Sequence, residues 1–274
     1  MSRIAGVFDE LQRSGRKALI PYIVAGDPDP AGTVPLLHKL VASGADVIEV
    51  GVPFSDPMAE GPVIQKGHER ALANGMTLKK VLSTVAEFRQ QDAKTPIVMM
   101  GYTNPIERFG YDAFADACVG AGVDGLITVD LPPEEVDAID TALQAVGLDN
   151  IFLISPTTPE SRIKTIVGRA RGFVYCVAVK GVTGSGQLDT TEVAESVALI
   201  RDKTTLPIAV GFGIKDAESA CAVAAAADAV VVGSALIDKM NQEAALGNTS
   251  QIQVHSAAVK LLRSIRAGVD SSPS

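Results

Sequence analysis

The residues of this chain best placed for acid–base chemistry are two glutamates in one short stretch, residues 45–62 (ADVIEVGVPFSDPMAEGP). Glu49 interrupts a run of Val and Ile that is typical of a strand buried on both faces. Because burying an ionised carboxylate is expensive unless it is paired or hydrated, Glu49 either has a partner or takes part in chemistry. This stretch alone leaves a second interpretation open, in which Glu49 points into solvent or pairs with a lysine.

Glu60 lies on the loop that follows this strand. Two prolines and a glycine between residues 53 and 61 exclude regular structure there, so the loop can fold over the strand end. Two carboxylates in different surroundings can divide acid and base roles, because their pKa values are pushed apart. A single loop glutamate is usually solvated, so the hypothesis depends on the pair.

Glycines gather after three consecutive late strands, at residues 181–186, 211–213 and 233–234. Glycine lets backbone N–H groups approach an anion closely, and a helix N-terminus adds a favourable dipole. Each cluster taken singly is explained as an ordinary turn. Three clusters at neighbouring strand ends favour a phosphate-binding site.

Eight apolar segments are expected to form strands, and each is followed by a helical pattern. The expected strands are residues 18–26, the strand around Glu49, and residues 96–100, 123–129, 151–154, 173–179, 207–211 and 229–232. The expected helices are residues 2–14, 31–43, 63–74, 78–91, 111–121, 134–146, 160–169, 191–201 and 216–226, with more helix near the end. Strands that alternate with helices pair in parallel, and eight repeats predict an α/β fold, a single (β/α)8 TIM barrel with an extra N-terminal helix.

The rival fold is an open doubly wound sheet. Its first strand–helix turn should carry G-x-G-x-x-G, which is absent here. We therefore expect one barrel domain over residues 1–267 and a disordered tail at 268–274. Active sites of such barrels lie at the C-terminal ends of the strands, which brings Glu49, the Glu60 loop and the late glycines to one mouth.

The composition excludes several classes of partner. The 274 residues are 47% hydrophobic and 20% charged, with a net charge of −8 and no block of Lys or Arg, which argues against nucleic acid and anionic membranes. No apolar run approaches the roughly 20 residues needed to span a bilayer, and the N-terminus lacks a signal-peptide core. Three isolated cysteines, Cys118, Cys176 and Cys221, favour a reducing cytoplasm.

The histidines His38, His68 and His255 have no metal-ligand spacing, so we expect surface or hydrogen-bonded histidines and no metal site. Five large side chains fall near strand C-termini and either line an apolar pocket or fill the barrel interior. They are Tyr22, Met100, Ile127, Leu153 and Tyr175. For any one of them, filling the interior is the simpler interpretation.

Residues 50–65 closely resemble the signature of the tryptophan synthase alpha chain family. Further matches run in order along residues 1–265, at 21–22, 26–28, 102–105, 130–132, 181–184, 211–214 and 233–234. The resemblance implies a lyase that cleaves indole-3-glycerol phosphate to indole and glyceraldehyde 3-phosphate in L-tryptophan biosynthesis. It also implies an αββα complex in which indole passes to a beta subunit. Pyridoxal phosphate is expected only in that beta subunit, and no cofactor is expected in this chain.

The resemblance assigns roles to individual residues. Glu49 matches the general acid/base, which needs a pKa well above the reference value of about 4.3. Glu60 stands where the family usually has Asp, the carboxylate that holds the indole N–H. The matching indole-pocket residues are Tyr22 (where Phe is common), Met100, Ile127, Leu153, Tyr175 and Phe212.

Two further groups of residues match the family. Thr183 and Gly184 match a mobile loop over the substrate, and the phosphate cradle corresponds to Gly184, Gly213, Gly233 and Ser234. The surface that contacts the beta subunit corresponds to Asp56, Pro57, Asn104 and Pro132. Two alternatives stay open, another phosphate-binding barrel enzyme of the same pathway and a non-catalytic regulatory subunit, which the change at position 60 encourages.

Overall fold

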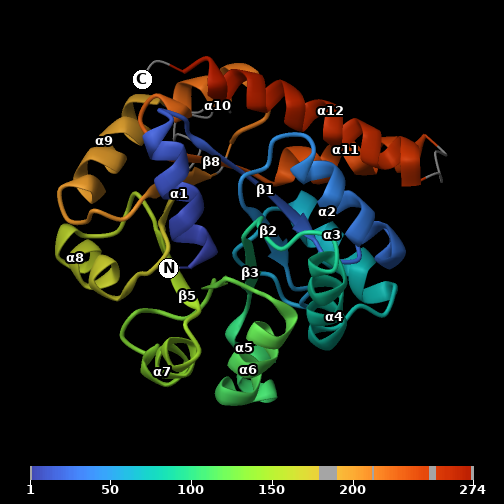
Figure 1. The fold of residues 1–274 in the computed structure, drawn as a ribbon, viewed down its shortest axis with the longest axis horizontal. Helices are drawn as coiled ribbons and strands as arrows, with labels where there is room; N and C mark the ends of the chain where they lie inside the picture. Colours follow the sequence, from blue (N-terminus) through green and yellow to red (C-terminus); the bar gives the residue numbers. More distant parts are fainter. Residues whose placement is uncertain (1, 179–189, 212, 247–250, 273–274) are drawn as a thin grey trace.

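The computed structural model describes residues 2–178, 190–211, 213–246 and 251–272. Its strands form a closed parallel barrel in sequence order from β1 to β8 (Figure 1). The strands are β1 (Ala18–Val24), β2 (Ile48–Gly51), β3 (Ile97–Gly101), β4 (Gly125–Thr128), β5 (Asp149–Ile154), β6 (Val174–Val177), β7 (Ile208–Gly211) and β8 (Ala229–Val232). Because β1 also pairs with β8, from Ala18 opposite Ala229 to Pro21 opposite Val232, the sheet has no edge. The barrel prediction is confirmed and the open sheet is excluded.

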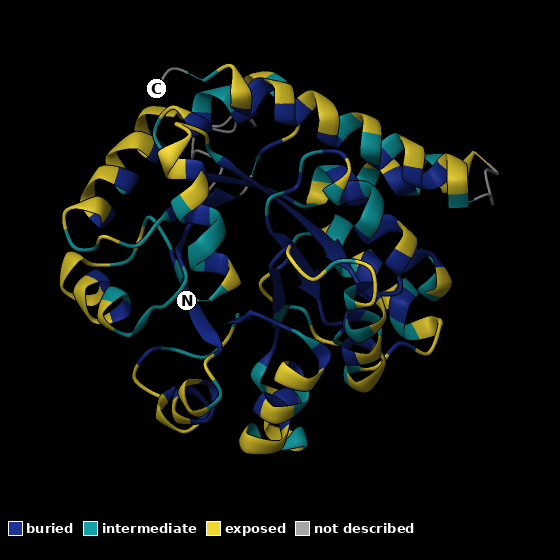
Figure 2. Cartoon of the chain, viewed as in Figure 1, coloured by how far each residue is buried: buried dark blue, intermediate teal, exposed yellow. Residues whose placement is uncertain are grey.

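Helices surround the strands in Figure 1, and each presents a buried stripe to the barrel and an exposed face to solvent (Figure 2). They are α1 (Arg3–Arg13), η1 (Pro30–Gly32), α2 (Thr33–Val41), α3 (Pro62–Ala73), α4 (Leu78–Arg89), α5 (Thr103–Phe109), α6 (Tyr111–Ala121), α7 (Asp137–Ala145), α8 (Glu160–Arg169), α9 (Thr190–Arg201), α10 (Ala217–Ala224), α11 (Ser234–Ala245) and α12 (Gln251–Asp270). No helix in the described ranges is long and apolar enough to cross a membrane.

The extra N-terminal helix α1 is amphipathic and packs against the barrel interior. Its buried residues Ile4, Phe8 and Leu11 belong to the same apolar cluster as Ala18 and Val47, which lie at or just before the starts of β1 and β2. Helix α1 therefore closes the N-terminal end of the barrel. The opposite end, where the strands finish, is left for chemistry.

Alternation along each strand decides which side chains face inward. On β2, Ile48 and Val50 pack in the outer cluster under the helices, whereas the preceding Val47 belongs to the interior cluster. Since strand side chains alternate with a period of two, Glu49 shares the inward face with Val47. The interpretation in which Glu49 points into solvent is excluded, because its side chain is fully buried.

Two local predictions differ from the structure. Residues 103–105, expected in a loop, open helix α5, because proline is tolerated in the first helical turn. The expected tail boundary at residue 267 is also wrong, since α12 continues to Asp270 and buries Gly268 and Val269. A Cβ at Gly268 would overlap the Ala217 carbonyl, so this glycine permits the close packing of α12 on α10.

Candidate active site

Glu49 is a buried carboxyl group with no hydrogen-bond partner for either oxygen in the described part of the chain. Burial disfavours the charged form and raises the pKa of Glu49 from its ordinary 4.5 to about 8. The group is therefore mostly a neutral carboxylic acid at pH 7. It is suited to give a proton to a substrate at the barrel mouth.

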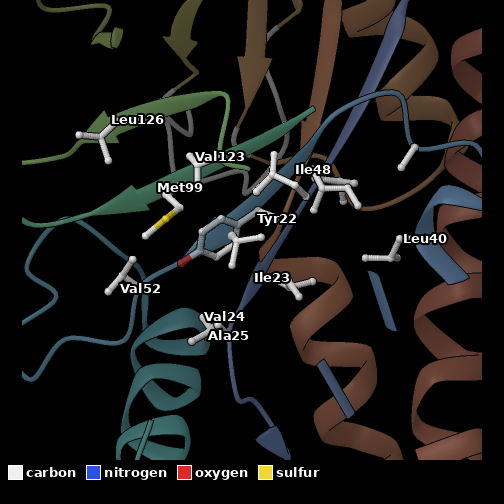
Figure 3. Packing of buried hydrophobic residues seen from close by; sticks show 14 of the residues in the cluster. Tyr22, Ile23, Val24, Ala25, Leu40, Ile48, Val52, Met99, Val123 and Leu126 are labelled. Carbon is white, nitrogen blue, oxygen red and sulfur yellow. The ribbon is translucent and has the colours of Figure 1, made fainter. Parts of the chain in front are cut away.

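Tyr22 is the neighbour of Glu49 on the adjacent strand. The two residues are register partners in the β1–β2 pair. A Cβ at Gly51 would overlap the Tyr22 hydroxyl, and a Cβ at Gly233 would lie 3.0 Å from the Tyr22 ring. Figure 3 shows the ring among buried apolar residues, with the hydroxyl oxygen on the side of Val52. The Tyr22 ring fits only because both glycines lack side chains.

Glu60 is brought to the same mouth by the loop after β2. Its carboxylate accepts a hydrogen bond from the Tyr102 hydroxyl, whose oxygen accepts from the Ala59 N–H at 3.1 Å. The Gln65 amide donates to the Glu60 carbonyl at 2.9 Å, and the Phe54 and Tyr102 rings stack with centroids 5.0 Å apart. Burial raises the pKa of Glu60, while the bond from Tyr102 opposes that rise. The loop is thus tied to the end of β3.

The Tyr22 hydroxyl lies within the electrostatic reach of both carboxyl groups. The pKa of Tyr22 is raised well above 10, first by burial, then by the charge of Glu60 and then by that of Glu49. Burial and the charge of Glu49 likewise raise the pKa of Tyr175, which stands on β6 on another wall of the barrel. The charges of both carboxyl groups thus act on Tyr22, and the charge of Glu49 also acts on Tyr175.

The other predicted pocket residues lie inside the barrel. Ile127 and Tyr175 belong to the interior cluster, and Met100 and Leu153 pack against it while staying partly exposed. Of the two interpretations, Ile127 fits the one in which it fills the barrel interior. Met100 and Leu153 lie at the edge of the interior cluster and are partly exposed. Phe212 lies outside the described residues.

The described part of the predicted phosphate cradle sits at the ends of two neighbouring strands, β7 and β8. Gly213 follows β7 with a φ of +77°, a left-handed conformation that favours glycine. Gly233 is the N-cap of α11 and Ser234 is its first residue. The N–H groups of Ser234 and Ala235 precede the first intrahelical bond, which the Leu236 N–H makes to the Gly233 carbonyl. An anion at this position is favoured by those N–H groups. Thr183 and Gly184 lie outside the described residues.

The residues predicted to contact a partner lie after the ends of β2, β3 and β4, with Asn104 in the first turn of α5. Asp56 and Asn104 are exposed, and Pro57 and Pro132 are half-buried. The Ser55 hydroxyl donates to Asp56 at 2.5 Å. Met58 is 81% exposed beside them, an apolar side chain that the sequence analysis did not single out.

His68 is a buried residue beside Tyr22 and Glu60 that the sequence analysis did not assign to the site. It lies on the buried face of α3, and its Nδ1 accepts the Phe54 N–H at 3.0 Å. Its Nε2 lies 3.4 Å from the Tyr22 hydroxyl and 3.9 Å from a Glu60 oxygen. Burial lowers the pKa of His68 to about 4, so the imidazole is neutral at pH 7. Its spacing of eight residues from Glu60 was the available signal, but spacing does not reveal which helix face turns inward.

Other features lie away from this mouth. A cavity of about 350 Å³ opens at the opposite end of the barrel, lined in part by Phe8, Lys17 and Arg201, and does not touch Glu49. We place the chemistry at Glu49 because the buried carboxyl groups are there. Within the described ranges, no three His, Cys, Asp or Glu side chains gather as a metal site.

Comparisons with known proteins agree with this geometry. A model of the tryptophan synthase alpha chain family matches residues 8–266. The chain is 59% identical over 240 residues to the tryptophan synthase alpha chain of Thioalkalivibrio sulfidiphilus, covering 88% of this chain and 90% of that one. It is 54% identical over 270 residues to that of Dechloromonas aromatica, covering 98% of both.

Solved structures give the same result. Tryptophan synthase subunit alpha from Legionella pneumophila matches with a TM-score of 0.91 at 45% identity, covering 98% of this chain and 99% of that one. A chain of tryptophan synthase from M. tuberculosis in its aminoacrylate-bound form matches with a TM-score of 0.85 at 34% identity, covering 98% and 100%.

Proposed function

The chain belongs to the tryptophan synthase alpha chain family, and we propose that Glu49 and Glu60 carry out the chemistry of its reaction. As the alpha subunit, the chain catalyses the alpha reaction of tryptophan biosynthesis, the retro-aldol cleavage of indole-3-glycerol phosphate to indole and glyceraldehyde 3-phosphate. The proposal concerns which side chains move the protons and hold the substrate.

Glu49 supplies the proton that starts the cleavage. Its neutral carboxyl group protonates the indole ring carbon that bears the side chain, which leaves a positive charge on the ring and a carboxylate on Glu49. The adjacent side-chain hydroxyl then gives its proton to that carboxylate. The carbon–carbon bond breaks, its electron pair returns to the ring, and indole and an aldehyde result. A pKa of about 8 for Glu49 supports this role, because the acid must still hold its proton at pH 7.

Glu60 stabilises the ring cation. Its carboxylate accepts the indole N–H and faces the positive charge that develops on the ring. The bond from Tyr102 favours the charged form of Glu60, which supports this second, electrostatic role. The two carboxyl groups thus divide the work, one neutral and one charged.

The phosphate end of the substrate is held by main-chain groups. Gly213, Gly233 and Ser234 offer backbone N–H groups beside the first turn of α11, where the helix dipole favours an anion. We assign Thr183, Gly184 and Phe212 to the closing loop and the pocket by resemblance, because they lie outside the described residues.

The observation that carries this proposal is the buried, unpartnered Glu49 carboxyl group beside Tyr22 in a chain of this family. The test is release of indole from indole-3-glycerol phosphate by the purified chain, with and without a beta subunit. Indole release with either preparation is expected. An isomerase or a purely regulatory subunit would release none in both.

The chain partners a beta subunit, as its family does. We propose an α2β2 tetramer in the cytoplasm, with pyridoxal phosphate bound only by the beta subunit and with Asp56, Pro57, Asn104 and Pro132 at the contact. Light scattering of the mixed subunits gives the stoichiometry. The exposure of Asp56, Asn104 and the apolar Met58 supports this placement, since a partner can cover an exposed apolar side chain.

A further inference from the structure

We propose that the Tyr22 hydroxyl donates a hydrogen bond to the Glu49 carboxylate that forms during turnover, and that His68 is the positioning residue that directs this donor. The inference rests on the proposed function and adds two residues to it. In this proposal Tyr22 donates to the carboxylate itself, whereas His68 acts through Tyr22.

The first step of the argument is the tautomer of His68. Its Nδ1 accepts the Phe54 N–H at 3.0 Å, so this nitrogen cannot also carry a proton. A neutral imidazole must then hold its proton on Nε2. The proton on Nε2 faces the Tyr22 oxygen at 3.4 Å, and the Tyr22 oxygen is the acceptor of that contact.

The second step is the direction of the Tyr22 proton. The Tyr22 oxygen accepts a hydrogen bond from His68 on the side that faces α3. The O–H of Tyr22 therefore points away from α3. The titratable groups that face Tyr22 are Glu49 from β2, Glu60 from the loop, Tyr102 beyond β3 and Tyr175 from β6, together with His68. The Tyr22 hydroxyl keeps its proton at working pH and can serve as a donor.

The third step is the need for such a donor at Glu49. Neither Glu49 oxygen has a hydrogen-bond partner in the described ranges, which suits the neutral acid. After proton transfer the same group is a buried carboxylate, which is costly unless a donor reaches it. Tyr22 is the register partner of Glu49 and supplies a protonated hydroxyl on the adjacent strand.

The surrounding structure fixes both residues. The Tyr22 ring occupies space that side chains at positions 51 and 233 would otherwise fill, and both positions are glycine. Helix α3 is anchored by Arg70, whose guanidinium donates to both oxygens of the buried Asp27 at 2.7 and 3.0 Å. The imidazole is therefore held between the loop that carries Glu60 and the strand that carries Tyr22.

Three variants test the proposal by steady-state kinetics of indole formation. The side-chain amide of Asn reaches only the position of His68 Nδ1, so His68→Asn removes the donor to Tyr22. The longer side chain of Gln places its amide at the position of Nε2, so His68→Gln keeps that donor. We expect Tyr22→Phe and His68→Asn each to lower kcat about tenfold with little change in KM, since each loses one hydrogen bond to a charged group. We expect His68→Gln to stay within about threefold of the original kcat, and Tyr22→Phe/His68→Asn to be no slower than either single variant.

The proposal is overturned if Tyr22→Phe leaves kcat unchanged, if His68→Asn and His68→Gln behave alike, or if the double variant shows the product of the single effects. His255→Asn is the matched control, since His255 is equally buried but lies on α12 beside Lys39. We expect it to leave kcat unchanged.

A second measurement does not depend on activity. The chain has three histidines, so ¹⁵N spectra of the imidazoles are assigned by comparison with His68→Asn. We expect the neutral Nε2–H tautomer for His68 at pH 7, and a Nδ1–H tautomer or a charged ring contradicts the proposal. If the original chain releases no indole, the proposed function fails, whereas the tautomer of His68 is still decided by the spectra.

Discussion

The hydroxyl of Tyr102 donates a hydrogen bond to the carboxylate of Glu60, although 42 residues separate them along the chain. This contact ties the loop after β2 to the end of β3 and brings the second carboxylate over the mouth that contains Glu49. It also favours the charged form of Glu60 against the effect of burial. The division of roles between the two carboxyl groups depends on it.

Tyr102→Phe should therefore weaken catalysis through Glu60. We expect kcat to fall about tenfold, because one hydrogen bond to a charged group is lost and the pKa of Glu60 rises further. Activity measured from pH 5 to 8 should show its acidic limb moved to higher pH. If the acidic limb of the activity profile is the same in Tyr102→Phe as in the original chain, the reaction does not need an ionised Glu60. Tyr111→Phe is the control, since Tyr111 is the first residue of helix α6 and is not the hydroxyl that bonds to Glu60.

Glu49 should make the folded protein less stable as the pH rises. The pKa of Glu49 is about 8 in the folded state against an ordinary 4.5, so the folded protein keeps a proton that the unfolded chain has released. The stability that the protonated Glu49 gives the folded protein is fully present below about pH 4.5. It is lost as the pH rises through 8, which lowers the free energy of unfolding by up to about 5 kcal/mol. Glu49→Gln cannot titrate and should lack this loss. Urea unfolding at pH 5 and pH 8 measures the difference, and parallel behaviour of the two proteins contradicts the prediction.

Gly51→Ala should destabilise the mouth because the new methyl group overlaps the Tyr22 hydroxyl. We expect a loss of about 1–3 kcal/mol in the free energy of unfolding. Adding Tyr22→Phe, which removes the hydroxyl, should restore part of that loss. Gly61→Ala is the control, since nothing lies within 4 Å of its Cβ position. Equal effects at the two glycines would show that Tyr22 does not limit the space at Gly51.

Gly213→Val should weaken binding of the phosphorylated substrate. A branched side chain is strained at a φ of +77° and blocks the approach of the backbone to an anion. We expect KM for indole-3-glycerol phosphate to rise at least about tenfold. Gly147→Val carries the same strain at a φ of +74° on the loop before β5 and should leave KM unchanged. The cradle is misplaced if both variants keep the original KM.

Much of the fold could be predicted because each strand is a short apolar run bounded by turn residues. The bounds of α6, α8 and β8 agree with the expectation, since glycine, proline or a change of periodicity marks their ends. Helix α5 was missed because Asn104 and Pro105 are typical of a turn, although proline also fits a first helical turn.

The two carboxyl groups could be predicted from sequence, but their partners could not. Glu49 was evident because a charge inside an apolar strand is costly. The contacts of His68 and Tyr102 depend on how α3 and the loop fold back onto β1 and β3, which local spacing does not encode. The end of α12 was missed because Gly268 and Ser271 suggest a tail, whereas packing against Ala217 orders the helix to Asp270.

The most direct test of the account is indole formation by Glu49→Gln, which keeps the shape of Glu49 but has no acidic proton. We predict that kcat falls about 10³-fold, within the range that acid–base catalysis supplies, while KM stays close to its original value. Full activity in Glu49→Gln would contradict the central claim that the buried carboxyl group moves the proton.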